Sequence, residues 1–203
     1  MAGPTREFWQ QRFESGQTPW DRGCAHPQLL HWIEVGLIQR GQRVLVPGCG
    51  RGHEVIALAQ AGIEVLGLDY APAAVDIVRQ TLASQHLNGC VELADVLTWR
   101  PDADLDLIYE QTCLCALHPD HWLRYGQQLF DWLKPGGLLL ALVMQAQRDS
   151  ARQGVIEGPP YHVDINAMRA LFPAGLWEWP RPPHAEIPHG QGWSELAVVL
   201  RRR

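Results

Sequence analysis

The sequence predicts an α/β fold in which helices cover a mostly parallel sheet. From Arg43 onward, short apolar runs alternate with longer segments of helical periodicity, which is typical of consecutive βαβ units. The first of these runs turns directly into Gly48, Gly50 and Gly52, as expected where a buried strand meets a helix. The chain has 203 residues, of which 46% are hydrophobic, enough for one domain with one filled core.

The expected elements follow one another without a linker or an internal repeat. Strands are predicted at residues 43–47, 64–69, 91–93, 105–110 and 138–144, with two more at 177–179 and 195–200 joined by a loop rich in Pro and His. Helices are predicted at residues 7–13, after Pro27, and at 53–60, 72–86, 119–133 and 165–172. We expect a single domain over residues 1–203, with residues 1–40 as a helical cover and 41–203 as the core.

Composition excludes several classes of function. The formal net charge is -5, and strong nonspecific binding to nucleic acid requires clustered Lys and Arg. No apolar stretch approaches the roughly 20 residues that span a bilayer. Five irregularly spaced cysteines do not resemble a secreted disulfide framework. We therefore expect a cytoplasmic protein that acts on a small molecule, as a monomer rather than an obligate oligomer, with neither a nucleic-acid nor a membrane partner.

The glycine-rich turn indicates a ligand site at the end of the first strand. Glycines let the backbone approach a ligand at a helix N-terminus. The spacing is G-x-G-x-G, not the G-x-G-x-x-G of dinucleotide sites, which disfavours a nicotinamide cofactor. Asp69 ends the next strand, where its carboxylate can meet an adenosine ribose. The alternatives are a plain tight turn and, for Asp69, a cap on the following helix.

Two more acids follow later strands. Asp95 with Val96 is placed to bind the exocyclic amine of an adenine above an apolar floor, and the alternative for Asp95 is a solvated loop residue. Glu110 ends the fourth strand, where it would face the crevice near a cationic part of the ligand, unless it is an ordinary edge residue.

With these residues in place, the chain resembles the class I S-adenosylmethionine-dependent methyltransferases, and among them the thiopurine S-methyltransferase family with its plant thiol and halide methyltransferase relatives. The resemblance spans almost the whole chain. Its motifs are Phe8-Trp9, Arg12-Phe13, Gly16 through Pro19-Trp20-Asp21, Val46 to Gly50, Gly67-Leu68-Asp69, Cys115-Ala116-Leu117, residues 133–137 and Gly158-Pro159-Pro160-Tyr161.

The resemblance implies a Rossmann-like, seven-stranded sheet with an antiparallel last strand, helices on both faces, and S-adenosylmethionine as cofactor. Trp9 and Trp20 resemble the family's N-terminal aromatic cover, with plain core packing as the alternative. The expected cofactor-binding residues are Trp9, Trp20, Gly48, Cys49, Gly50, Gly52, Asp69, Tyr70, Asp95, Val96 and Glu110. Trp20 and Tyr161 are the expected acceptor-binding residues, and no residue is assigned as a catalytic acid or base.

The predicted reaction is methyl transfer to a small soft nucleophile, such as a thiol, a thiopurine, or a selenium, tellurium or halide species. A non-catalytic sensor of the cofactor and a small-molecule O- or N-methyltransferase remain alternatives. The segment from Gly158 to Tyr161 is similar to a motif of base-methylating enzymes, but it does not follow the fourth strand as it does there. Cys113, Cys115, His118 and His121 lack the spacing of a structural zinc site, so no metal is expected.

Overall fold

The computed structural model describes residues 3–189 and 192–203, and it divides into two compact units. Thr5–Ile108 forms the first unit, and Tyr109–Arg203 forms the second together with the described residues before Thr5. From Thr5 onward, the predicted helical cover thus belongs to the same unit as the first three strands. The prediction of a single domain over the whole chain stays a prediction.

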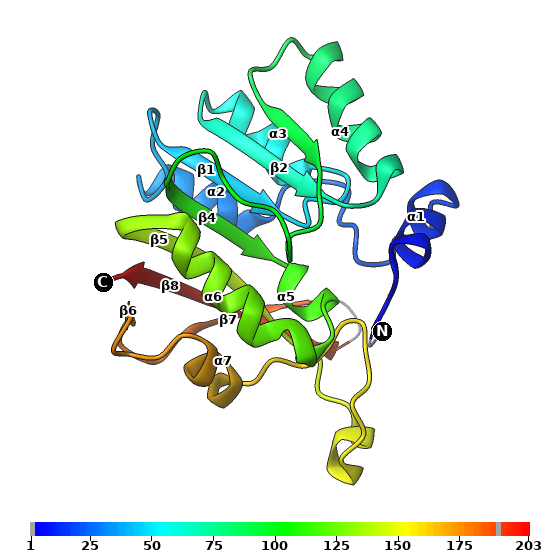
Figure 1. Cartoon of the computed structure of the whole chain (residues 1–203), viewed down its shortest axis with the longest axis vertical. Helices are drawn as coiled ribbons and strands as arrows, with labels where there is room; N and C mark the ends of the chain where they lie inside the picture. Colours follow the sequence, from blue (N-terminus) through cyan, green and yellow to red (C-terminus); the bar gives the residue numbers. More distant parts are fainter. Residues whose placement is uncertain (1–2, 190–191) are drawn as a thin grey trace. The chain divides into compact units, whose positions relative to one another are not determined.

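The first unit is built from parallel βαβ units (Figure 1). Its elements are α1 (Arg6–Glu14), α2 (Pro27–Glu34), β1 (Arg43–Pro47), α3 (His53–Gln60), β2 (Glu64–Asp69), α4 (Pro72–Ser84), β3 (Cys90–Leu93) and the larger part of β4 (Leu105–Gln111). β1 pairs in parallel with both β2 and β4, and β2 pairs in parallel with β3. All the strands that meet in this unit therefore end at one edge of the sheet.

Apolar periodicity explains why these segments adopt these forms. Leu45 in β1 and Leu68 in β2 are completely buried, as expected for strands covered on both faces. α4 begins with Pro72 in its first turn, and its buried residues recur at the spacing of one helical face. These buried residues of α4 are Ala74, Val75, Val78 and Leu82.

The second unit is centred on a long antiparallel pair. Its elements are the end of β4, α5 (Cys113–Ala116), η1 (Pro119–His121), α6 (Trp122–Trp132), β5 (Leu133–Gln145), η2 (Asp149–Gln153), α7 (Ile165–Leu171), β6 (Trp177–Glu178), β7 (Ala185–Pro188) and β8 (Ser194–Arg202). β5 and β8 pair in unbroken register from Leu138 opposite Arg201 to Gln145 opposite Ser194. The last strand is therefore antiparallel, as the sequence predicted.

The sixth strand position is occupied by two short strands rather than one. β6 pairs with the end of β8 at Arg201 and Arg202, whereas β7 pairs with its beginning, from Ser194 to Ala197. The chain between them contains three prolines, which have no N–H to donate to a ladder. Because both pair with β8, they extend the sheet beside the same strand. The sequence analysis assigned residues 185–188 to a loop and missed β7.

The hydrogen-bonded strand order is β3-β2-β1-β4-β5-β8-β6, with β7 paired to β8 outside this path. This is the predicted Rossmann-like α/β fold, with a mostly parallel arrangement and an antiparallel last strand. The sheet has eight strands instead of the predicted seven, because β6 and β7 are separate strands that both pair with β8. Among the described residues, no helix has the length and apolar character needed to cross a membrane.

Several predicted boundaries shift for local reasons. The first turn of the helix predicted at 119–133 is the 3-10 helix η1, and α6 ends one residue earlier than expected, at Trp132. β5 begins at Leu133, so the predicted glycine turn at 134–137 lies at the start of the strand. The short helix α5 was not predicted at all, because its four residues are too few to show a period.

Candidate cofactor site

The glycine turn between β1 and α3 requires its glycines. Gly48, Gly50 and Gly52 have φ values of 60°, 53° and 76°, a region that L side chains rarely adopt. A Cβ on Gly52 would lie 2.5 Å from Cγ2 of Val78 in α4. The turn thus brings bare backbone to the N-terminus of α3, a favourable place for a polar or anionic ligand group.

Asp69 lies at the carboxyl end of β2 and bonds directly to this turn. Its Oδ2 accepts a hydrogen bond of 2.9 Å from the backbone N–H of Gly50, and its Oδ1 accepts one of 2.9 Å from Ala71. The side chain is buried, and burial raises the pKa of the carboxyl. The backbone N–H of Tyr70 is a third donor to this carboxyl group. Two carboxylate oxygens offer about four acceptor positions, so these three bonds leave about one for a ligand hydroxyl.

Asp95 and Val96 lie beside Asp69, as the sequence predicted for neighbouring strands. The N–H of Ala94 donates to the carbonyl of Asp69 over 2.9 Å, which links the end of β3 to the end of β2. Asp95 is exposed and its Oδ1 accepts from Leu97 over 2.8 Å, whereas Val96 is buried. The roles of Asp95 and Val96 toward an adenine stay predictions.

Two other predicted residues complete this part of the first unit. Cys49 is buried, and its N–H donates to Leu68 over 2.8 Å. Tyr70 is half-buried between Asp69 and the start of α4.

An aromatic cluster lies against the glycine turn. The ring of Trp20 meets those of Trp9 and Phe13 edge to face, with centroids 5.4 and 6.2 Å apart. These rings pack on Ala71 and Ala74 at the start of α4. The ring of Phe13 also lies 3.6 Å from where a Cβ on Gly50 would be. Trp9, Phe13 and Trp20 thus form one packed cluster, which we call the aromatic cover, and Phe13 was not among the residues predicted for the site. The role of Trp9 and Trp20 in covering the cofactor stays a prediction.

Asp21 is a second residue that the sequence analysis did not assign to the site. Its carboxylate lies 3.0 Å from Nε of Arg51 in the glycine turn and 2.8 Å from Nε2 of His53 at the start of α3. These two partners are 30 and 32 positions away in the sequence, so no local sequence pattern predicts the contacts. The signal that was present is the adjacency of Asp21 to Trp20.

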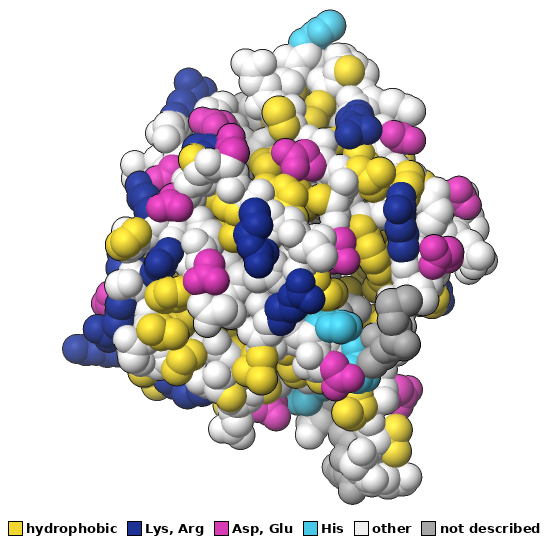
Figure 2. Space-filling view, in the orientation of Figure 1, with side chains coloured by type: hydrophobic (Ala, Val, Ile, Leu, Met, Phe, Trp, Pro, Cys, Tyr) yellow, Lys and Arg dark blue, Asp and Glu magenta, His cyan; other side chains and the backbone are white. Residues whose placement is uncertain are grey.

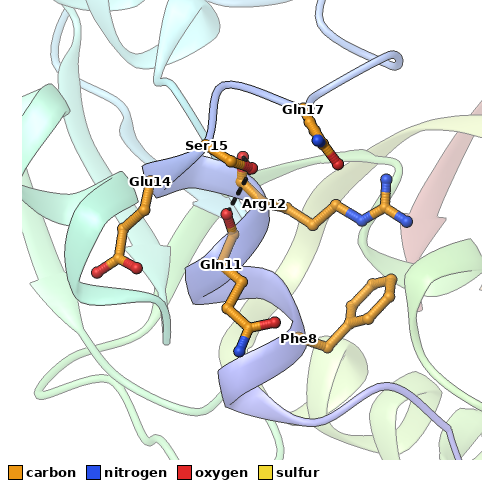
Figure 3. Close-up of a pocket in the computed structure, with 6 residues that line it drawn as sticks. All are labelled: Phe8, Gln11, Arg12, Glu14, Ser15 and Gln17. Atoms are coloured by element: carbon orange, nitrogen blue, oxygen red, sulfur yellow. Dashed lines mark hydrogen bonds between the residues drawn. The ribbon is translucent and has the colours of Figure 1, made fainter.

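An open hollow lies beside α1 and the turn that follows it (Figure 3). The hollow has a volume of about 640 Å³ and is lined by Phe8, Gln11, Arg12, Glu14, Ser15 and Gln17. The guanidinium carbon of Arg12 lies 4.9 Å from the ring centroid of Phe8, four residues earlier on the same helical face. The side chains of Phe8 and Arg12 extend to the same side of the helix in the figure.

Two predicted site residues lie in the second unit. Glu110 is buried, and its Oε1 accepts a hydrogen bond of 2.6 Å from the N–H of Leu114 in α5. Burial raises the pKa of Glu110 to about 7, and the charge of Glu195 adds to this effect. Tyr161 is buried, and its ring meets that of His118 edge to face at 5.4 Å. The roles of Glu110 and Tyr161 toward cofactor and acceptor stay predictions.

The cysteines near Glu110 are buried thiols. Cys113 and Cys115 are both free, and burial raises the pKa of Cys115 well above its usual value. Within residues 3–189 and 192–203, no group of three or more His, Cys, Asp or Glu side chains is placed to hold a metal ion.

Comparison with known proteins identifies the family. The family model described as thiopurine S-methyltransferase matches residues 4–185. The chain belongs to the thiopurine S-methyltransferase family. It is therefore an S-adenosylmethionine-dependent methyltransferase, and the glycine turn with its buried Asp69 fits this cofactor.

Relatives within and beyond the family agree with this assignment. The chain is 36% identical to a probable thiol methyltransferase 2 of Arabidopsis thaliana over 173 residues, covering 83% of this chain and 73% of that protein. It is 33% identical to thiocyanate methyltransferase 1 of the same plant over 195 residues, covering 93% and 82%. Its fold is similar to that of a Burkholderia thailandensis 1,6-didemethyltoxoflavin-N1-methyltransferase solved with S-adenosylhomocysteine, with a TM-score of 0.74, 17% identity and coverage of 97% and 86%.

Proposed function

We propose that this member of the thiopurine S-methyltransferase family transfers a methyl group to a small soft nucleophile, with thiols as the first candidates. The observation that carries the proposal is the buried Asp69 carboxylate, bonded to the glycine turn beside an aromatic cover. The names of the thiol and thiocyanate methyltransferase relatives support a sulfur acceptor.

We assign the cofactor contacts as follows. Asp69 binds a ribose hydroxyl, since its oxygens retain acceptor capacity. Asp95 accepts from the adenine amine, and Val96 contacts the ring. Trp9 and Trp20 cover the bound molecule. The remaining proposed cofactor-binding residues are Gly48, Cys49, Gly50, Gly52, Tyr70 and Glu110.

The chain contributes positioning and exclusion of water. The cofactor, when bound, supplies a methyl group that its sulfonium already makes electrophilic. A thiol with a pKa of about 8.5 is only a few per cent ionised at neutral pH, which costs about 2 kcal/mol. Holding the acceptor in line with the methyl group contributes roughly 7 to 11 kcal/mol, so the reaction does not demand a dedicated base. We propose that Trp20 and Tyr161 hold the acceptor.

The first test is binding of S-adenosylhomocysteine by calorimetry, with NADH as the ligand control. We expect binding by the wild type and a loss of at least tenfold in Asp69→Asn, because a charge-assisted hydrogen bond contributes about 1.5–3 kcal/mol. Asp102→Asn is a matched control, since Asp102 is exposed and pairs with Arg43 over 2.8 Å in the same unit. Preferential binding of NADH would contradict the cofactor assignment.

The second test is product analysis by mass spectrometry with a panel of acceptors. We expect methylation of a thiol, sulfide or thiocyanate, and slower or absent methylation of matched alcohols and amines. Cofactor binding without turnover of any acceptor would favour a sensor of the cofactor instead. Turnover confined to alcohols or amines would favour an O- or N-methyltransferase.

We also propose a cytoplasmic location, a small-molecule partner and a monomeric state. All five cysteines are free, which suits a reducing compartment. Basic and acidic side chains are interspersed over the face drawn in Figure 2, which does not favour a nucleic-acid partner. Size-exclusion chromatography with light scattering tests the oligomeric state.

A further inference from the structure

Asp21, in the segment that joins α1 to α2, makes three contacts through its carboxylate. Its Oδ1 accepts a hydrogen bond of 2.8 Å from the N–H of Gly23 and lies 2.8 Å from Nε2 of His53. Its Oδ2 lies 3.0 Å from Nε of Arg51. The side chain of Asp21 is only 17% exposed, so water screens these contacts less than it screens a surface ion pair.

Both long-range partners belong to the glycine turn and the helix that follows it. Arg51 lies between Gly50 and Gly52, whose positive φ values fix the course of the turn. His53 is the first residue of α3. One carboxylate from the N-terminal segment therefore binds two side chains that the turn itself holds in place.

The same local turn sets the positions of Asp21 and Trp20. The N–H of Asp21 donates to the carbonyl of Thr18 over 2.9 Å, which closes a turn around Pro19 and Trp20. The ring of Trp20 then contacts Trp9, as described above. The Asp21 carboxylate and the Trp20 indole ring therefore extend from neighbouring residues of one closed turn.

We propose that Asp21 is a positioning residue that fastens the aromatic cover to the glycine turn. By binding Arg51 and His53, it holds Trp9, Phe13 and Trp20 against the turn before the cofactor arrives, and so lowers the entropic cost of binding. The inference rests on the proposed function in one respect, namely that the cover encloses the cofactor. Asp21 acts through the cover and is not a catalytic residue.

The bond to Gly23 gives the competing explanation, that Asp21 only stabilises its own loop. Asp21→Asn separates the two explanations because the amide oxygen still accepts from Gly23, while the negative charge that binds Arg51 is lost. Arg51→Gln removes the same ion pair from the other side and leaves the loop around Asp21 intact. Asp102→Asn, which removes an exposed ion pair in the same unit, is the matched control.

The test combines hydrogen exchange without ligand and S-adenosylhomocysteine binding by calorimetry. In both variants we expect exchange in residues 5–24 to rise about tenfold while exchange in β1 and β2 stays at the wild-type level, as for local opening. We expect S-adenosylhomocysteine to bind about tenfold more weakly, because binding must then also order the aromatic cover. The double variant Asp21→Asn/Arg51→Gln should bind S-adenosylhomocysteine nearly as well as either single variant, because both substitutions remove the same interaction.

Steady-state kinetics adds a readout that a loss of folding would not reproduce. With a thiol acceptor, the KM for S-adenosylmethionine should rise about tenfold, while kcat changes by less than about twofold, since the chemical step is untouched. Asp102→Asn should match the wild type in every measurement.

Three outcomes would overturn the proposal. Wild-type exchange and affinity in both variants would show that the contacts do not hold the cover, with the proposed function unaffected. A rise in exchange throughout Thr5–Ile108 would make Asp21 a general stabiliser of the unit. Additive effects in the double variant would mean that Asp21 and Arg51 act separately. Failure of the wild type to bind S-adenosylhomocysteine would instead count against the proposed function, and the exchange of residues 5–24 would still decide the role of Asp21.

Discussion

Replacing Glu110 by glutamine should change how the stability of the protein depends on pH. Glu110 is buried and its Oε1 accepts a hydrogen bond from the N–H of Leu114. A glutamine carbonyl preserves this bond and has nearly the same shape. The backbone N–H of Cys113 also bonds the carboxyl group, so Glu110→Gln adds an offset that does not depend on pH to the removal of the titration. The pH dependence of the difference from the wild type therefore isolates the free energy of ionising a buried carboxyl.

The magnitude follows from the raised pKa. Burial moves the pKa of Glu110 from 4.5 to about 7, so the folded state holds the proton more tightly than the unfolded state. The resulting stabilisation is complete below pH 4.5 and is lost as pH rises through 7. At about 1.4 kcal/mol per pH unit, the loss amounts to about 3 kcal/mol. For a chain of this length it corresponds to a decrease in Tm of roughly 6–12 °C.

Urea unfolding and thermal unfolding between pH 4.5 and 8 measure this effect. As pH rises from 4.5 to 8, the free energy of unfolding of Glu110→Gln should increase by about 3 kcal/mol relative to that of the wild type. The reason is that the variant has no proton to lose at this position. Glu178→Gln is the control, since Glu178 is 61% exposed and should follow the wild-type curve in parallel. A constant difference between the wild type and Glu110→Gln at all pH values would refute the reasoning.

Three further substitutions test the turn, a helix cap and the cover. Gly52→Ala places a Cβ at a φ of 76° and 2.5 Å from Val78, and should lower the free energy of unfolding by about 1–3 kcal/mol; an unchanged urea midpoint would contradict the strain argument. Asp164 accepts two backbone N–H bonds of 2.7 and 2.9 Å at the start of α7. Asp164→Ala should therefore lower the free energy of unfolding by about 1 kcal/mol in the same assay. A change near zero would mean that water replaces the cap. Trp20→Ala should weaken S-adenosylhomocysteine binding about tenfold through the loss of aromatic contacts, whereas Leu123→Ala, at a site 72% exposed, should not; equal affinities would remove Trp20 from the site.

The parallel half of the fold was predictable because each of its elements has a local cause. β1 and β2 match their predicted bounds. A short apolar run that ends at Gly48 or Asp69 is too short for a typical helix and is best explained as a buried strand. Asp69 was predicted at the ligand site by the rule that ligands bind at the carboxyl ends of parallel strands. The prediction that Trp9 and Trp20 belong to the site came from the family motifs, because neither residue lies at the end of a strand.

The features that the sequence did not predict depend on distant partners. α5 has only four residues and is bonded at its start by the Glu110 side chain. β7 has only four residues and follows a segment rich in proline, and it forms a strand because β8 supplies its hydrogen-bonding partners. The contacts of Asp21 join residues brought together only after β1 and α3 have formed. In each case tertiary contacts override a weak local preference.

The place of β8 has a consequence for biosynthesis. This strand pairs with β5 on one side and with β6 and β7 on the other, so it is an inner strand of the second unit although it comes last in that unit. Its partners in β5 are about fifty to sixty residues earlier, a long separation that slows strand pairing. As the polypeptide leaves the ribosome, the strands of Thr5–Ile108 are available early. The edge of β5 that pairs with β8 stays exposed until β8 has been synthesised. We expect the nascent chain to be most prone to aggregation in that interval, before Ser194–Arg202 emerges.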